Sequence, residues 1–227
     1  MKLALYTTYC GMNDYSTIKP RPIQTRYPNY LVSNNDNFLD TISKSFGYKP
    51  IFYDVPVTAD STVSAKQSKV PKMLPTIFKE LAQYDYLLYY DDKLILNLNA
   101  IESAIEELNS SNLPIALRAH PTTPNPNVLF DFAESMYQWR YRCDWESMVK
   151  YITDEVESGY KLYSDRYFAT GIVLRNMKHE ETHAINQLWY EHTARCSAVC
   201  QISFHFVKQR FNNNVMTLPE DIINPWF

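Results

Sequence analysis

"YDYLLYYDDKLIL", residues 84–96, is an apolar run that ends at two adjacent aspartates, Asp91 and Asp92. The β-favouring residues of 84–92 predict a buried strand. Polar side chains at the carboxyl end of such a strand lie at the edge where α/β sheets bind ligands. Carboxylate oxygens suit Mg²⁺ or Mn²⁺, and these ions bridge the oxygens of a diphosphate. The pattern therefore predicts a metal and diphosphate site, and a solvated turn after the strand is the alternative.

Strand and helix patterns alternate on both sides of this stretch. Apolar β-type runs predict further strands at 2–9, 30–36, 49–55, 113–121 and 166–176. Apolar residues at helical spacing predict helices at 37–48, 69–83, 99–111, 127–142, 144–158, 180–195 and 198–211. This alternation indicates an α/β fold in which helices flank a central sheet. No repeat, low-complexity tract or linker interrupts the 227 residues, so we expect a single domain, 1–227.

The composition is that of a globular protein. Hydrophobic residues make up 45% and charged residues 21%, which allows a sizeable core. The net charge of −3 gives no electrostatic attraction for nucleic acid or an anionic membrane surface. No apolar stretch approaches the roughly 18 residues that span a bilayer, and the N-terminal apolar run is too short for a signal peptide. Four scattered cysteines are interpreted as reduced thiols. We therefore expect a cytoplasmic protein, and its Tyr- and Asn-rich, Gly-poor usage fits an AT-rich genome such as that of a large virus.

Residues 179–183, HEETH, match the H-E-x-x-H signature of zinc peptidases. That site needs a helix that is largely apolar around its ligands, and it needs a third metal ligand. Here the neighbouring residues are charged, and Asn186 and Trp189 stand where the extended signature has its glycine and third histidine. We therefore discount the peptidase hypothesis and interpret Glu180 and Glu181 as favourable charges at a helix N-terminus.

Basic residues upstream of the aspartate pair offer positive charge to a diphosphate. Lys66, Lys69 and Lys72 lie within SAKQSKVPKM, residues 64–73. Lysine ammonium groups are point charges that neutralise phosphate oxygens. A plain basic surface loop is the alternative interpretation of this segment.

The order of these segments resembles that of glycosyltransferase-like proteins of the GT-A type, and more narrowly a group found in plants, bacteria and large viruses. The resemblance runs through most of the chain, and its matching residues are Tyr6, Thr7, Gly11, Lys66, Lys69, Asp91, Lys93, His120, Glu134 and Arg175. YFATGIVLRN, residues 167–176, also resembles the F-N-x-G-V-x-L-x-N strand of GT-A enzymes. Two places depart from the group: Asp92 replaces a glycine, which gives a D-x-D-like pair, and Val199-Cys200-Gln201 replaces Arg-Asp-Gln.

The resemblance implies a Rossmann-like GT-A fold with a mixed central sheet, and a metal-dependent glycosyltransferase. Such an enzyme moves a sugar from a UDP- or GDP-sugar to a hydroxyl group of a glycan or protein acceptor. The donor contacts that it implies are Thr7, Thr8, Tyr9, Lys66, Lys69, Asp91, Thr170 and Gly171, with residues 34–36 as a second nucleotide-binding segment. Mn²⁺ or Mg²⁺ would lie on Asp91 and Asp92.

The resemblance leaves the proton acceptor and the activity itself open. His120, at a strand end, would line the sugar or acceptor pocket, or it is an ordinary loop histidine before a proline. His120, Glu134 and Asp165 are the candidates for a general base. Because the Arg-Asp-Gln segment is absent, a non-catalytic relative that only binds a nucleotide sugar or a sugar is the alternative.

Overall fold

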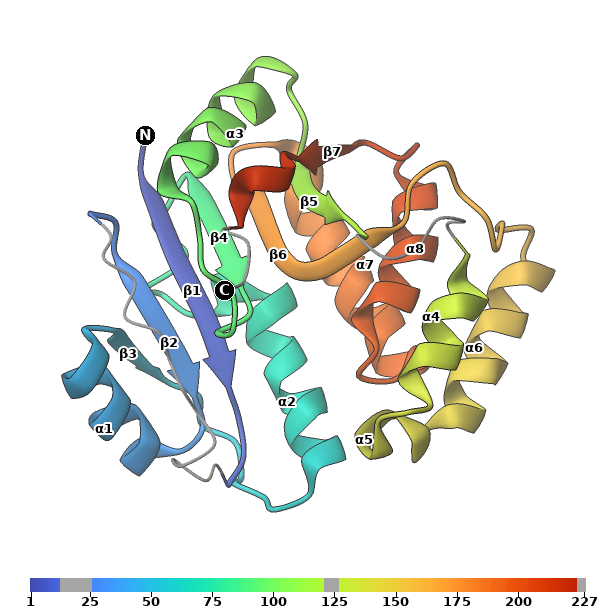
Figure 1. Cartoon of the computed structure of the whole chain (residues 1–227), viewed down its shortest axis with the longest axis horizontal. Helices are drawn as coiled ribbons and strands as arrows, with labels where there is room; N and C mark the ends of the chain where they lie inside the picture. The colour runs from blue at the N-terminus through green and yellow to red at the C-terminus, as the bar shows by residue number, and fades with distance from the viewer. Residues whose placement is uncertain (13–25, 121–126, 224–227) are drawn as a thin grey trace.

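The central feature of the fold is one seven-stranded mixed β-sheet (Figure 1). The computed structural model describes residues 1–12, 26–120 and 127–223. In these residues the strand order is β3-β2-β1-β4-β6-β5-β7, and β6 is antiparallel to both of its neighbours. The remaining neighbours pair in parallel. The predicted α/β class, with a mixed central sheet flanked by helices, is confirmed.

The strand directions bring several polar segments to one edge of the sheet. The strands are β1 (Leu3–Tyr9), β2 (Asn29–Ser33), β3 (Lys49–Phe52), β4 (Tyr86–Tyr90), β5 (Ile115–Ala119), β6 (Phe168–Asn176) and β7 (Val215–Leu218). All five residues of β4 are buried, because β4 lies between β1 and β6 and is covered on both faces. The carboxyl ends of β1, β4 and β5 point the same way, and the antiparallel β6 begins where β4 and β5 end. This edge is the one at which α/β sheets bind ligands.

Helices cover both faces of the sheet. On one face lie α1 (Asp36–Phe46) and α3 (Leu98–Ser110), whose apolar residues join one core with β1, β2 and β4. On the other face lie α2 (Ser61–Met73), α7 (Glu180–Cys196) and α8 (Cys200–Arg210). A third layer, α4 (Val128–Ser135), α5 (Trp139–Arg142) and α6 (Trp145–Glu157), lies outside α7 and α8 (Figure 1), where α4 and α6 share a separate core with them. Two short 3-10 turns, η1 (Pro75–Ile77) and η2 (Glu220–Ile222), complete the elements.

The first helix begins and ends for local reasons that the sequence displays. The side chain of Asn35 accepts a hydrogen bond from the backbone N–H of Phe38, which caps the N-terminus of α1. Gly47 follows the last helical residue with a φ of 73°, a left-handed conformation that glycine adopts without steric penalty. The predicted stop at Gly47 is confirmed.

The helix predicted at 69–83 is wrong in its position. The observed helix α2 spans Ser61–Met73, and the chain after it forms a 3-10 turn instead. The side chain of Asp60 accepts hydrogen bonds from two amides of the first turn, which starts the helix well before the prolines. Pro71 lies in the last turn, so the hydrogen bond that it cannot donate is lost only near the helix end.

Strand β7 is absent from the sequence-based prediction, which ends with a helix. Its four residues are too few to show a period, and they form a strand because β5 offers an open parallel edge. The region 127–142, predicted as one helix, holds the two helices α4 and α5. Within the described part of the chain, no helix is both long enough and apolar enough to cross a membrane.

Candidate active site

A cavity of about 610 Å³ opens at the edge of the sheet where β1, β4 and β5 end. Its lining comes from the end of β1, helix α2, the residues after β4 and β5, helices α4 and α5, and the start of α8. The predicted site residues that line it are Thr8, Tyr9, Lys69, Asp91, Asp92, His120, Glu134 and Thr170. Residues more than a hundred positions apart in sequence therefore meet in one space.

The carboxylate of Asp91 is held at the end of β4 by its neighbours. The backbone N–H of Asp91 donates to the carbonyl of Gly171 at 2.7 Å, and the Tyr89 hydroxyl donates to Asp91 Oδ1 at 2.8 Å. A Cβ atom added to Gly171 would lie 2.9 Å from Asp91 Oδ2, which is too close for a real contact. The glycine therefore leaves the space that this carboxylate occupies.

The adjacent carboxylates of Asp91 and Asp92 both line the cavity, where they offer oxygen atoms of the kind that a divalent cation takes. Burial, together with the negative charge of Asp91, raises the pKa of Asp92. Two carboxylates that repel each other in a partly buried place gain from a cation between or beside them. The ligands are hard oxygens, which Mg²⁺ and Mn²⁺ prefer.

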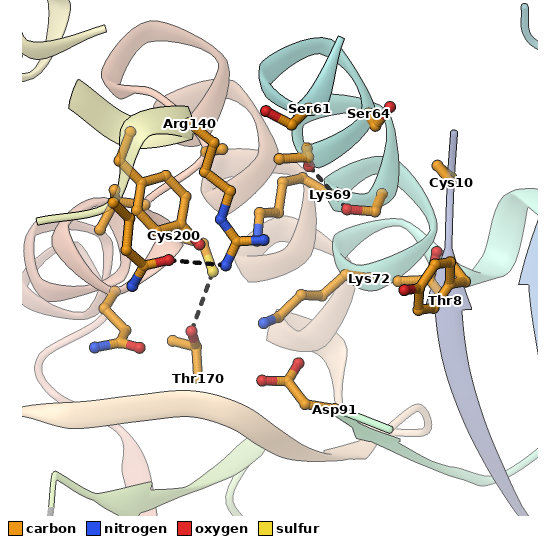
Figure 2. Close-up of a pocket in the computed structure, with 18 of the residues that line it drawn as sticks. Thr8, Cys10, Ser61, Ser64, Lys69, Lys72, Asp91, Arg140, Thr170 and Cys200 are labelled. Carbon is orange, nitrogen blue, oxygen red and sulfur yellow. Dashed lines mark hydrogen bonds between the residues drawn. The ribbon is translucent and has the colours of Figure 1, made fainter. Parts of the chain in front are cut away.

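Three basic side chains, which we call the cationic wall, face the same space: Lys69, Lys72 and Arg140 (Figure 2). Among the described residues, none of the three has a carboxylate oxygen within 4.0 Å, whereas Lys66 pairs with Asp144 at 2.6 Å. Lys72 is the most enclosed, with 3% of its surface exposed. Its ammonium lies over the Tyr89 ring, 4.6 Å from the centroid, and has no hydrogen-bond or ion-pair partner among the described residues. An anion in the cavity would satisfy these charges.

A buried arginine fixes the segment that carries Lys72. Arg175 is fully buried and donates to the carbonyl oxygen of Lys72 at 2.8 Å, to the Tyr6 hydroxyl at 3.1 Å and to Asn186 Oδ1 at 2.8 Å. Burial lowers the pKa of Arg175. Arg175, which the resemblance marks, thus ties the end of α2 to β1, β6 and α7, and it does not line the cavity.

A second group, which we call the acid wall, consists of His120, Asp131 and Glu134. One potential ligand or proton-accepting atom from each lies within 4.8 Å of the others. Asp131 accepts hydrogen bonds from the Tyr167 hydroxyl and from Gln201 Nε2, both at 3.0 Å, and burial raises the pKa of Asp131 to about 6. Burial lowers the pKa of His120, which favours the neutral imidazole. Sequence reasoning missed Asp131, although its spacing of three from Glu134 places both on one helix face.

Four predicted site residues lie outside this cavity. Thr7 lines a separate small cavity between β1 and α1, because alternate residues of a strand point to opposite faces. Gly171 approaches Asp91 closely and accepts a hydrogen bond from its backbone N–H. Lys66 lies on α2 in its ion pair, and Asp165 is exposed on the loop before β6. The roles of all the predicted site residues stay predictions.

In the predicted segment 34–36, the side chain of Asn34 forms hydrogen bonds with the backbone of neighbouring loops. Asn34 is buried and accepts a hydrogen bond from the N–H of Gly11 at 2.8 Å, while its amide donates to the Pro56 carbonyl at 3.0 Å. Gly11 has a φ of 103°, and a Cβ there would collide with the Ser64 hydroxyl. These contacts hold the loop after β1 against α2, which shapes one side of the cavity.

The HEETH segment lies at the start of α7. His179 is the N-cap, and its Nδ1 accepts from the N–H of Glu181 at 3.2 Å, while His183 is exposed. Among the described residues, the one group of three or more potential metal ligands is the acid wall, which contains neither histidine. The segment is a helix start, as the sequence interpretation expects.

The fold is that of glycosyltransferases of the GT-A type. Mouse xyloside xylosyltransferase 1 superposes with a TM-score of 0.54 over 96% of this chain and 85% of its own, at 11% sequence identity. The bifunctional glycosyltransferase WbbM (TM-score 0.49, 12% identity) matches 96% of this chain and 39% of its own. Core-mannan synthase A from Aspergillus fumigatus, in a Mn/GDP form (TM-score 0.49, 10% identity), matches 99% of this chain and 74% of its own. No family model and no curated protein matches the sequence. At these identities, the similarity defines the fold alone.

Proposed function

We propose that this protein transfers a sugar from a UDP- or GDP-sugar to a hydroxyl group of a glycan or protein acceptor. The observation that carries the proposal is the cationic wall, which faces the strand-end aspartates across a cavity and has no carboxylate partner among the described residues. A nucleoside diphosphate offers the negative charge that both features suit, the wall directly and the aspartates through a cation. The fold shared with a xylosyltransferase supports the choice.

Asp91 and Asp92 would hold Mn²⁺ or Mg²⁺, because their oxygens are the hard ligands that these ions take. When bound, such an ion supplies Lewis-acid stabilisation of the departing diphosphate. Gly171 leaves the space that the Asp91 carboxylate needs for this role, and the Tyr89 hydroxyl donates a hydrogen bond to one of its oxygens.

The remaining cavity residues divide between donor and acceptor. Thr8 and Tyr9, at the end of β1, would contact the nucleotide. Lys69 and Lys72 would stabilise the negative charge that grows on the diphosphate as the glycosidic bond breaks. Because these ammonium groups are already in place, no reorganisation is needed at that moment.

The acid wall would face the acceptor hydroxyl and take its proton. A proton acceptor works best when its pKa lies near the working pH, and the pKa of Asp131, raised to about 6, meets this condition. Asp131 therefore joins His120 and Glu134 as a candidate. Asp165 becomes the weakest candidate, since it lies outside the cavity. The cytoplasmic location predicted from the sequence stays a prediction.

The proposal is tested with a panel of UDP- and GDP-sugars in the presence of Mn²⁺ or Mg²⁺. Titration calorimetry measures binding, and the release of UDP or GDP measures transfer to water or to an added acceptor. We expect Lys72→Met to weaken donor binding by about 10- to 100-fold, the usual effect of removing a hydrogen bond to a charged group. Lys79→Met is the matched control, because Lys79 is exposed, follows the same helix and does not line the cavity.

Three results distinguish the alternatives. Binding and turnover that fall in Lys72→Met but not in Lys79→Met support the transferase. Binding without any turnover indicates the non-catalytic nucleotide-sugar-binding relative. The proposal fails if no nucleotide sugar binds the wild-type protein, or if the two lysine variants bind with equal affinity.

A further inference from the structure

The thiol of Cys200 lies inside the candidate active site. Cys200 is the first residue of α8, lines the cavity and is 5% exposed. Its Sγ atom lies 3.1 Å from the hydroxyl oxygen of Thr170, at the start of β6 (Figure 2). The Cys200 carbonyl accepts hydrogen bonds from Trp189 Nε1 and from the Ser203 hydroxyl, both at 3.0 Å. The backbone that carries the thiol is therefore held from two sides.

The surroundings of Cys200 stabilise a thiolate, in contrast to the other buried thiols. Burial alone would raise the pKa of Cys200, but the charges of Lys69 and Lys72 and the hydrogen bond with Thr170 outweigh it and lower the pKa. Burial raises the pKa of Cys10 to about 11 and that of Cys196 well above its ordinary value. The thiolate is the nucleophilic form of cysteine.

The burial of Lys72 indicates that an anion is expected beside this thiol. Lys72 is almost fully buried and directs an ammonium with no hydrogen-bond or ion-pair partner among the described residues into the same space (Figure 2). A lysine in that position is satisfied by a ligand that brings negative charge. On the proposed function, that ligand is the diphosphate of the donor.

Cys200 and its chain neighbour Gln201 connect to both walls of the cavity. On one side its thiol interacts with the charges of the cationic wall. On the other side the next residue, Gln201, donates to Asp131 of the acid wall at 3.0 Å. If the diphosphate lies at the cationic wall and the sugar that it carries extends toward the acid wall, the anomeric carbon lies next to Cys200. Once the diphosphate has left, the acceptor can enter on the face that it vacates, opposite the thiol.

We propose that Cys200 is the nucleophile of a two-step sugar transfer, an inference that rests on the proposed function. In the first step a lone pair of the thiolate attacks the anomeric carbon, and the bond from that carbon to the diphosphate oxygen breaks with its electrons on the oxygen. In the second step the acceptor oxygen attacks the same carbon, and the carbon–sulfur bond breaks with its electrons on sulfur. The acceptor proton passes to the acid wall. Each step inverts the carbon, so the product retains the donor's configuration.

The test uses the UDP- or GDP-sugar that the wild-type protein turns over best, with Mn²⁺. Wild-type protein is quenched in acid in the absence of acceptor and analysed by intact mass and peptide mapping. We expect one glycosyl group on the Cys200 peptide, a product of retained configuration by NMR, and at least a 100-fold loss of turnover in Cys200→Ala, with donor affinity unchanged within about threefold. Cys143→Ala is the control, since Cys143 is exposed and lies outside the cavity.

Two further measurements separate the possible failures. Cys200→Ser keeps the size of the side chain, and it should fold and bind donor but share the loss of turnover. Peptide mapping after iodoacetamide treatment should show faster labelling of Cys200 than of Cys196, and protection of Cys200 by UDP or GDP with Mn²⁺. Wild-type turnover by either Cys200 variant, a product of inverted configuration, no adduct in the quenched protein, or equal labelling of the two thiols would overturn the inference alone. If no nucleotide sugar binds, the proposed function fails and the inference fails with it.

Discussion

The substitution Gly171→Ala tests the site at the place where the structure allows least change. The added Cβ would lie 2.9 Å from Asp91 Oδ2, 3.5 Å from Asp91 Cγ and 3.7 Å from Leu94 Cδ1. Ordinary contacts begin at 3.4 Å, so the carboxylate must move by about 0.5 Å, the difference between these distances. Such a shift also strains the hydrogen bond from the Tyr89 hydroxyl to Asp91 Oδ1.

We expect this displacement to lower turnover by about 10- to 100-fold, or about 1.4–2.7 kcal/mol in the barrier, because a misplacement of about 1 Å costs on the order of 100-fold. The free energy of unfolding should change by less than about 1 kcal/mol, since alanine gains roughly 0.5–1 kcal/mol over glycine within a strand and offsets part of the contact strain. Thermal unfolding and nucleotide release measure the two effects.

A double-mutant cycle makes the reasoning refutable. If Gly171→Ala acts through the carboxylate, it should add little loss of metal-supported donor binding in an Asp91→Ala background. An equal loss in both backgrounds, or wild-type turnover in the single variant, would show that the close approach of Gly171 has no role in the site.

The other predictions concern regions outside the cavity. His183→Ala should leave the free energy of unfolding, the zinc content and turnover unchanged. His179→Ala should lower the free energy of unfolding by about 1 kcal/mol, because α7 loses its N-cap, and should not change turnover. Loss of stoichiometric zinc in either variant would contradict this prediction. Glu155→Gln should lower the free energy of unfolding, measured in urea, by about 3 kcal/mol, because Arg210 loses its charge partner. Arg210 is 21% exposed and lies 2.7 Å from the buried Glu155 carboxylate. A change below about 1 kcal/mol would contradict this prediction. Burial lowers the pKa of His205 to about 4, so the unfolded state takes up the proton at a higher pH than the folded state does. The free energy of unfolding should therefore decrease by about 3 kcal/mol as the pH is lowered from 6.5 to 4. His205→Gln should flatten this part of the unfolding profile, and an unchanged slope would contradict the assignment.

The sequence predicts the fold class well because the central strands are apolar enough to be recognised one at a time. Strand 84–92 and helix 37–48 show clear patterns, and both lie within about two residues of their observed ends. The start of α2 was missed because its first turn holds mainly polar and β-branched residues, and its N-cap Asp60 was the only local signal. Strand β7 depends on pairing with β5, which is 100 residues earlier, and no local pattern reports that.

The site residues at the ends of strands could be predicted from the sequence. The site residues on helices that meet only in the folded protein could not. Asp91 and His120 follow predicted strands, so their place at the ligand-binding edge follows from topology. Asp131 and Arg140 come from helices whose position over that edge depends on packing against α7 and α8. The environment of Cys200 depends on α2, β6 and α8 together, and its pKa reflects charges that lie 128 and 131 positions earlier in the sequence, at Lys72 and Lys69.

The binding of a UDP- or GDP-sugar with and without a divalent ion tests the central claim most directly. A diphosphate beside Asp91 and Asp92 is repelled unless a cation intervenes, so the wild-type protein should bind the donor with Mn²⁺ and much more weakly with EDTA. Asp91→Ala should lose the metal-supported affinity while its thermal unfolding stays close to that of the wild type, and Asp92→Ala should lose it more mildly. Titration calorimetry on the three proteins gives the answer. Equal affinity with Mn²⁺ and with EDTA in the wild type would mean that the aspartate pair is only a polar turn after β4.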